Sequence, residues 1–262
     1  MPKLIINIKQ LIQVRDKDIP FVKAEGMNEL PSISDAFLLV KNGVIADFGK
    51  MSKMPNFGDI QTINAKDKIV LPAWCDSHSH SVFTGNRSDE YMQRIKGATY
   101  EEIAKNGGGI LKSSYQINSI SLDDLYEESK KRIKSLIRQG TGALEIKSGY
   151  GLSYDSELKM LEVISRLKNS LPIEIKSTFL GAHAVPKNYK KEEYFNLVID
   201  KMLPDFVDKK LVDYVDIFCE ENYFSANDTI SICKRANELD VRVKIHTNQF
   251  SSIGGVKAGV EC

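Results

Sequence analysis

Four histidines are the residues of this sequence with the clearest capacity for metal or acid–base chemistry. They are His78, His80, His183 and His246, and each lies at or just after the carboxyl end of a predicted strand. When parallel strands form a barrel, those ends meet on one face, where active sites lie. The placement therefore predicts one shared site rather than separate packing roles.

Two of these histidines form an H-x-H pair, in the sequence Asp-Ser-His-Ser-His at residues 76–80. Side chains two residues apart on an extended chain point the same way, so His78 and His80 can bind one metal ion together. His246 could supply a third ligand across the mouth of the barrel. An H-x-H pair can also be an ordinary surface pair, but the position at a strand end favours a metal site.

Four further side chains follow predicted strands and could contact a substrate. His183 could carry a proton or hydrogen-bond a developing oxyanion, or it could be a satisfied histidine at a strand end. Arg87 could bind a carboxylate through two N–H groups, although a solvated loop arginine is the commoner outcome. Tyr150, in a glycine-rich turn, could present its hydroxyl or pack over the turn, and Gln249 could hydrogen-bond a ring amide.

The elements that must position these residues alternate between strands and helices from residue 66 onward. This alternation predicts parallel strands with helices outside, and several consecutive units favour a (β/α) barrel. Glu220 and Glu221 close the fourth strand, and either carboxylate could orient a metal ligand or face water. The predicted strands are 69–75, 142–147, 173–180, 214–219 and 241–245, and the predicted helices are 121–139, 156–168 and 225–239.

The first 65 residues instead contain short apolar runs and turns. Asn42-Gly43 separates two such runs and predicts a hairpin, because both central residues of a type I′ turn need positive φ. We therefore expect two domains, a small β-rich unit at 1–65 and a barrel at 66–262. Five strands are fewer than the eight of a closed barrel. We expect a truncated barrel from the front part of a longer protein, with a smaller open α/β sheet as the alternative.

Composition excludes several classes of protein. The chain of 262 residues has 36 Lys+Arg and 35 Asp+Glu, so it lacks the basic excess of a nucleic-acid-binding protein. No apolar stretch approaches the ~18 residues that a membrane span needs. The four cysteines contain no C-x-x-C pair and fit neither a disulfide framework nor a cysteine-rich zinc site. Reduced cysteines and a cytoplasmic location are the simplest prediction.

Several motifs together resemble a known family. Residues 71–80 resemble the first-strand metal motif of the amidohydrolase superfamily. Residues 83–87, 107–111, 145–152, 178–186 and 244–249 together resemble the imidazolonepropionases of that superfamily, and the likeness runs from about residue 36 to the end. The resemblance implies an α/β fold with a TIM-type barrel. It also implies that the N-terminal unit is half of a small β-sandwich.

The resemblance further implies an activity and its residues. The reaction would be hydrolysis of the ring amide of 4-imidazolone-5-propanoate to N-formimidoyl-L-glutamate, in histidine degradation, by a homodimer. One zinc or iron ion would be held by His78, His80 and His246. The substrate would be contacted by Arg87, Tyr150, His183 and Gln249, with His183 also catalytic.

The chain departs from the family pattern in one important way. The family takes a further histidine from the sixth barrel strand and an aspartate from the eighth, and neither strand is among the five predicted here. We therefore expect the chain to be inactive alone. The alternatives are another amidohydrolase, such as a cyclic amidase or a deaminase, and a non-catalytic metal-binding module built on a truncated barrel.

Overall fold

The computed structural model describes residues 2–15, 19, 21–99, 102–103 and 106–262. The chain divides into two compact units, Met1–Ala73 and Trp74–Cys262. The sequence pattern predicts this division after residue 65. The structure places it later because residues 69–70 pair with the first strand of the chain.

The first unit contains one mixed sheet with the strand order β3-β2-β1-β4, and β5 also pairs with β1. Asn42 and Gly43 have φ angles of 55° and 80°, which confirms the predicted hairpin between β2 and β3. Ile8 and Leu38 lie in the apolar cluster on one side of the sheet. The strands are β1 (Lys3–Ile12), β2 (Ser32–Lys41), β3 (Val44–Lys50), β4 (Gln61–Asn64) and β5 (Ile69–Val70), with short 3₁₀ helices η1 (Ala24–Asn28) and η2 (Met51–Lys53).

The strand predicted at residues 69–75 is wrong as a single element. The structure divides it into β5, which pairs with β1, and β6 (Trp74–Ser79), which pairs with β7 (Thr141–Lys147). Pro72 lies between the two halves. Proline has no N–H to donate to a neighbouring strand, so it interrupts a strand that its apolar neighbours would otherwise continue.

The second unit contains a curled sheet of five parallel strands in the order β10-β9-β8-β7-β6. This order places β6 and β10 at the two edges of the sheet. Lys244 of β10 nevertheless donates a hydrogen bond of 3.2 Å to the carbonyl oxygen of Ser77 in β6, so the concave side is narrow enough for one side chain to cross. The remaining strands are β8 (Glu174–Ala182), β9 (Tyr214–Cys219) and β10 (Arg242–Thr247).

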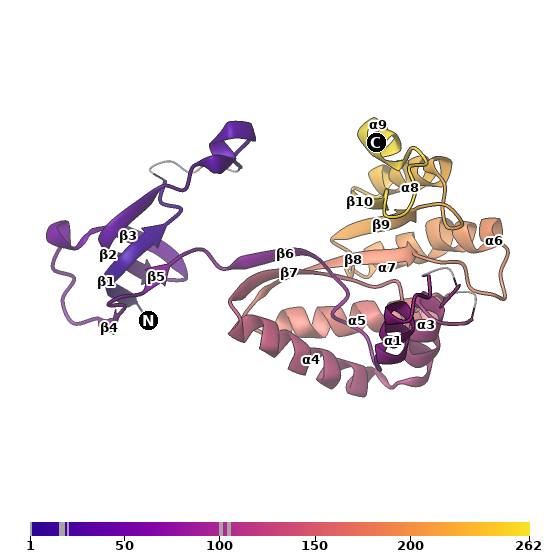
Figure 1. Cartoon of the computed structure of the whole chain (residues 1–262), viewed down its shortest axis with the longest axis horizontal. Helices are drawn as coiled ribbons and strands as arrows, with labels where there is room; N and C mark the ends of the chain where they lie inside the picture. The colour runs from indigo at the N-terminus through magenta and orange to yellow at the C-terminus, as the bar shows by residue number, and fades with distance from the viewer. Residues whose placement is uncertain (1, 16–18, 20, 100–101, 104–105) are drawn as a thin grey trace. The chain divides into compact units, whose positions relative to one another are not determined.

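Helices connect the strands and cover the convex side of the sheet, where α4 and α5 pack against each other and against β7 and β8 (Figure 1). The three predicted helices are confirmed within two residues at each end. Ser121 and Ser153 accept hydrogen bonds from N–H groups of the first turns of α4 and α5, as expected for N-caps. The elements are α1 (Ser88–Ile95), α3 (Ile110–Ser119), α4 (Leu122–Arg138), α5 (Tyr154–Ser170), α6 (Lys191–Asn196), the π-helix η3 (Leu197–Met202), α7 (Leu203–Asp208), α8 (Ala226–Glu238) and α9 (Gly255–Glu261).

The two faces of this sheet differ in chemistry. One set of alternating strand residues joins the main apolar cluster with the helices, including Leu144, Ile146, Val215 and Ile217. The other set carries charge and faces the concave side, because successive side chains of a strand point to opposite faces. Its members are Glu145, Lys147, Asp216, Lys244 and His246, which contact one another.

None of the helices formed by the described residues is both long and apolar enough to cross a membrane.

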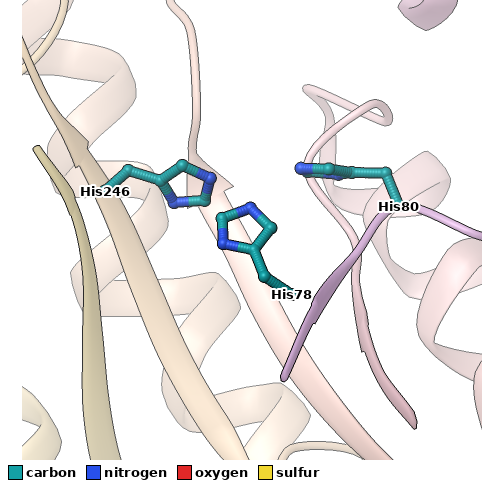
Figure 2. A group of neighbouring side chains, drawn as sticks. All are labelled: His78, His80 and His246. Carbon is teal, nitrogen blue, oxygen red and sulfur yellow. The ribbon is translucent and has the colours of Figure 1, made fainter. Parts of the chain in front are cut away.

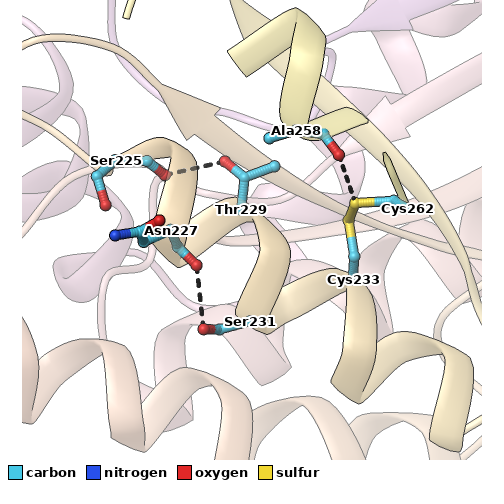
Figure 3. Close-up of a disulfide and its surroundings, with 7 residues drawn as sticks. All are labelled: Ser225, Asn227, Thr229, Ser231, Cys233, Ala258 and Cys262. Atoms are coloured by element: carbon cyan, nitrogen blue, oxygen red, sulfur yellow. Dashed lines mark hydrogen bonds between the residues drawn. A yellow bond between two sulfur atoms is a disulfide. The ribbon is translucent and has the colours of Figure 1, made fainter. Parts of the chain in front are cut away.

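A disulfide joins Cys233 in α8 to Cys262, directly after α9 (Figure 3). The prediction that the cysteines are all reduced is therefore wrong for this pair. The two residues are 29 positions apart and become neighbours only because α9 packs against α8, so no local spacing reveals them. Sγ of Cys262 also lies 3.0 Å from the carbonyl oxygen of Ala258, but a disulfide sulfur has no proton to donate. Cys75 and Cys219 are free thiols.

Candidate metal site and substrate pocket

The three histidines of the predicted metal site lie together. Each offers one ring nitrogen, and these nitrogens all lie within 4.8 Å of one another. Figure 2 shows the rings of His78, His80 and His246 turned toward a common region from two different strands. Three imidazole nitrogens at this separation can share one metal ion after small side-chain adjustments.

The curl of the sheet explains how residues 166 or more positions apart meet here, since β6 and β10 are its outermost strands. His78 belongs to β6, and His80 follows directly after it. His246 lies near the carboxyl end of β10. The ring centroids of His78 and His246 are 4.3 Å apart, so the two edges of the sheet approach each other at their carboxyl ends.

The surroundings keep the first two histidines neutral. Burial lowers the pKa of His78, and the neighbouring His246 acts in the same direction. Burial lowers the pKa of His80 further, with the neighbouring histidines acting in the same direction. Because a neutral imidazole has a free lone pair, both rings are in the protonation state that binds a metal.

His183 and Tyr150 extend the cluster on one side. The ring of His183 stacks on His80 with 5.2 Å between centroids and an interplanar angle of 10°. The Tyr150 ring lies 5.0 Å from His80 and 5.5 Å from His183. Both residues were predicted to contact substrate, and the structure places both beside the candidate metal ligands.

The hydrogen bonding of His183 determines what its other nitrogen can do. Nδ1 of His183 lies 2.8 Å from the carbonyl oxygen of Gly149, and a carbonyl only accepts, so Nδ1 carries the proton. Burial lowers the pKa of His183 to about 3. The ring is therefore neutral at neutral pH, and Nε2 presents a lone pair. This favours an acceptor role over the predicted donation to an oxyanion.

Arg87 lines a pocket beside His80 and is held there by a residue of α3. Its Nε and one terminal nitrogen donate hydrogen bonds of 3.1 and 2.8 Å to Oγ of Ser113 in α3. The guanidinium lies 5.2 Å from the centre of the Tyr150 ring. The pocket has a volume of about 360 Å³ and is lined by His80, Phe83, Thr84, Gly85, Asn86, Arg87, Ser113, Gln116 and Tyr150.

The loop that carries Arg87 is itself braced by Arg132 of α4. Arg132 donates hydrogen bonds to the carbonyl oxygens of Ser81 and Phe83, and its guanidinium lies 3.6 Å from the centre of the Phe83 ring. Helix α4 thus fixes the start of the pocket wall, directly after the H-x-H pair.

A buried glutamate holds the turn that carries Tyr150. We call residues 149–152 the Tyr150 turn. The carboxylate of Glu157, in the first turn of α5, accepts hydrogen bonds of 2.9, 2.7 and 2.9 Å from the backbone N–H groups of Gly149, Gly151 and Leu152. Glu157 is not among the predicted site residues, although an acidic residue just after a glycine-rich turn is a local signal for such a contact.

A second buried glutamate holds the residues after β10, which we call the Gln249 turn (residues 249–251). Glu220 accepts hydrogen bonds of 2.9, 2.9 and 3.0 Å from the backbone N–H groups of Gln249, Phe250 and Ser251. The structure shows neither role considered for Glu220: its carboxylate is buried and does not face water, and it holds the backbone of a loop and not a candidate metal ligand. Gln249 is fixed through its backbone, and its side chain is exposed rather than packed among the histidines.

The comparisons with known proteins agree with this arrangement. No family model matches the chain. It is 52% identical to the imidazolonepropionase of Flavobacterium psychrophilum, over 100% of the chain and 64% of the relative. It is 38% identical to the imidazolonepropionase of Clostridium tetani, over 98% of the chain and 62% of the relative.

Solved structures share the fold at low sequence identity. The 5-methylcytosine deaminase of Klebsiella pneumoniae has a TM-score of 0.68 and 15% identity, over 98% of this chain and 55% of its own. The zinc complex of a mutant atrazine chlorohydrolase of Arthrobacter aurescens has a TM-score of 0.64 and 15% identity, over 95% of this chain and 53% of its own. Over its whole length the chain is similar to the imidazolonepropionases, and it spans 64% of the relative from Flavobacterium psychrophilum.

Proposed function

We propose that this chain forms the metal-binding and substrate-binding part of an imidazolonepropionase. The reaction is hydrolysis of the ring amide of 4-imidazolone-5-propanoate to N-formimidoyl-L-glutamate. The observation that carries the proposal is the convergence of His78, His80 and His246 beside His183, in a chain 52% identical to a named imidazolonepropionase.

The residues fit a divalent metal ion. Nδ1 of His80 is buried and has no hydrogen-bond partner among the described residues, which suits a nitrogen reserved for a ligand. The lowered pKa values of His78 and His80 keep both rings neutral. Zinc or iron accepts such an imidazole set. When bound, the metal supplies Lewis acidity, which acidifies water and polarises an amide carbonyl.

The pocket beside the histidines suits a ring with an anionic tail. Arg87 keeps N–H groups beyond the two that Ser113 accepts, and they can bind the propionate carboxylate. Tyr150 can pack against the imidazolone ring, and Nε2 of His183 can accept a hydrogen bond from a ring N–H. Holding the ring at both ends orients the amide bond toward the metal site. Gln249 contacts the ring amide in this proposal.

We propose a half-barrel interpretation of the second unit and a half-sandwich interpretation of the first. In this view the second unit, Trp74–Cys262, supplies five strands of a TIM-type barrel, and the first unit, Met1–Ala73, supplies part of a β-sandwich. The carboxylate that accepts the proton and a further histidine come from residues outside these five strands. A homodimer acting on a small molecule in the cytoplasm, without nucleic-acid or membrane partners, completes the proposal.

Metal content and turnover together test this function. We expect about one equivalent of zinc or iron per chain, with hydrolysis of 4-imidazolone-5-propanoate only when the chain is combined with the segment of the Flavobacterium psychrophilum relative that it does not match. Turnover of aminated bases or other cyclic amides instead would favour another amidohydrolase. Bound metal without any turnover would favour a binding module, and absence of stoichiometric metal would refute the site.

Two variants assign the roles within the active assembly. His78→Ala should remove metal and activity together, and metal retained at full occupancy would exclude His78 as a ligand. Arg87→Ala should mainly raise KM while metal content stays constant. An unchanged KM for the propionate substrate would exclude Arg87 as the carboxylate contact.

A further inference from the structure

A buried charged cluster lies on the concave side of the sheet, next to the three histidines, and the proposed reaction leaves it without a role. It consists of Glu145 and Lys147 on β7, Asp216 on β9 and Lys244 on β10. Lys147 is 1% exposed, and its Nζ lies 2.6 Å from both Oε1 of Glu145 and Oδ2 of Asp216. Nζ of Lys244 lies 2.9 Å from Oε2 of Glu145. Two cations and two carboxylates therefore balance, as buried charges require.

One member of the cluster also contacts a candidate metal ligand. Oδ2 of Asp216 lies 2.9 Å from Nδ1 of His246, and Asp216 is 1% exposed. No well-aligned hydrogen bond reaches this buried nitrogen within the described residues, so the carboxylate contacts it at ion-pair distance only. Oδ1 of Asp216 accepts the N–H of Ile217 at 2.8 Å, which fixes the plane of the carboxylate.

This contact selects one form of the His246 ring. An ionised carboxylate only accepts hydrogen bonds, so it favours the tautomer with the proton on Nδ1. The lone pair of a neutral ring then lies on Nε2. Metal-ligating histidines commonly use one nitrogen for the metal and donate the other N–H to a carboxylate, which fixes the ring orientation.

We propose that Asp216 is a positioning residue, which holds His246 in the orientation and tautomer that bind the metal, and that Lys147 holds Asp216 in turn. The inference rests on the metal site of the proposed function. It concerns the affinity for metal, through a residue that does not itself contact the metal or the substrate.

Glu145 provides a matched control within the same cluster. It is buried, carries the same charge as Asp216 and contacts the same Lys147 nitrogen at the same 2.6 Å. Its other partners are Thr178 and Lys244 rather than a histidine. A purely structural cluster predicts equal effects of neutralising either carboxylate, whereas a positioning role predicts an effect of Asp216 alone on metal binding.

The experiment measures zinc affinity of the chain by competition with a chromophoric chelator at fixed pH. Asp216→Asn should weaken zinc binding about 10–100-fold, the range seen when a carboxylate partner of a ligand histidine is lost. Glu145→Gln should change it less than about threefold, because the partners of the Glu145 carboxylate are Lys147, Lys244 and Thr178 and not a candidate metal ligand. In a His246→Ala background, Asp216→Asn should cause no further loss, because its route to the metal is gone.

Each outcome has a defined meaning. The inference would be overturned if Asp216→Asn and Glu145→Gln weakened zinc binding equally. It would also be overturned if Asp216→Asn had its full effect on zinc affinity in the His246→Ala background. Either result would leave the proposed metal site intact. Failure of the unsubstituted chain to bind zinc would overturn the proposed metal site and this inference with it. Should Asp216→Asn not fold, ¹⁵N NMR of the unsubstituted metal-free chain decides: the Nδ1–H tautomer of His246 supports the role, and the Nε2–H tautomer refutes it.

Discussion

The Tyr150 turn and the Gln249 turn are each held by a buried glutamate, but the surroundings of the two turns differ. Glu157 and Glu220 each accept three backbone N–H groups of the turn they hold. Burial raises the pKa of Glu157, and the hydrogen bonds to it only partly offset that effect. Burial acts in the same direction on Glu220, but hydrogen bonds from Ser251 and the backbone outweigh it and hold the pKa at about 2.

The difference shows that the number of donors does not alone decide the state of a buried carboxylate. Glu157 is completely buried, and the turn above it packs into the unit through buried Leu152. Glu220 is almost as buried, but residues 248–250 beside it are exposed, with Phe250 at 55%. Water can therefore replace a lost contact at the Gln249 turn but not at the Tyr150 turn.

Neutralising each glutamate should give the largest difference in stability between the two turns. Glu157→Gln should lower the free energy of unfolding by about 3 kcal/mol, because an amide N–H₂ then opposes a buried N–H group that water cannot reach. Glu220→Gln should cost about 1 kcal/mol, because water solvates the exposed turn. Urea unfolding measures both values, and hydrogen exchange at residues 149–152 and 249–251 shows which turn loosens. Equal costs would mean that exposure of the turn does not matter.

Replacing a glycine near each turn should give a smaller difference in stability, because space for a Cβ limits one glycine and backbone conformation limits the other. A Cβ at Gly151 would collide with the backbone of Ser156 and Glu157, so Gly151→Ala should cost about 2–3 kcal/mol through displacement of the start of α5. Gly254 has space for a Cβ but a φ of 91°, so Gly254→Ala should cost about 1 kcal/mol. Thermal unfolding of the two variants provides the comparison, and a Gly254→Ala cost above that of Gly151→Ala would contradict it.

Local signals explain which parts of the molecule the sequence predicted. The helix predicted from residue 121, the Asn42-Gly43 turn and the positions of the histidines at strand ends are each defined by neighbours within a few positions, and the structure bears out all three. The disulfide partner of Cys233 depends on packing between α8 and α9, so no single segment predicts it. Pro72, by contrast, was a local signal that the predicted strand at 69–75 left out of account.

The positioning residues were missed for a further reason. Glu157 lies in a helix pattern beside Leu158 and Leu161, where an acidic residue is normally solvated. Asp216 interrupts the apolar run of β9, and this was the available signal, since a charge in a central strand needs a partner. The identity of that partner depends on the curl of the sheet, which the sequence does not encode locally.

The pH dependence of the two glutamate variants should have opposite signs. The folded pKa of Glu157 is raised above 4.5, so its contribution to stability is complete below pH 4.5 and declines as pH rises through the folded pKa. The folded pKa of Glu220 is depressed, so its contribution is complete above pH 4.5 and is lost as pH falls toward about 2. The cost of Glu157→Gln should therefore grow on acidification and that of Glu220→Gln should shrink, in unfolding titrations across this range. Parallel trends would show that the two carboxylates titrate alike.

The smallest effect should come from the hydroxyl of Ser251, which donates to Glu220 alongside the three backbone N–H groups. Ser251→Ala removes this donor but leaves the backbone contacts, so the cost should be about 0.5–1 kcal/mol. In a Glu220→Gln background the same substitution should cost less, because the acceptor has lost its charge. Ser153→Ala, which removes the N-cap of α5 without touching a glutamate carboxylate, is the matched control and should cost the same in both backgrounds. A Ser251→Ala cost that is independent of Glu220 would show that the hydroxyl stabilises the Gln249 turn by itself. The Glu220 carboxylate would then hold that turn through backbone contacts alone.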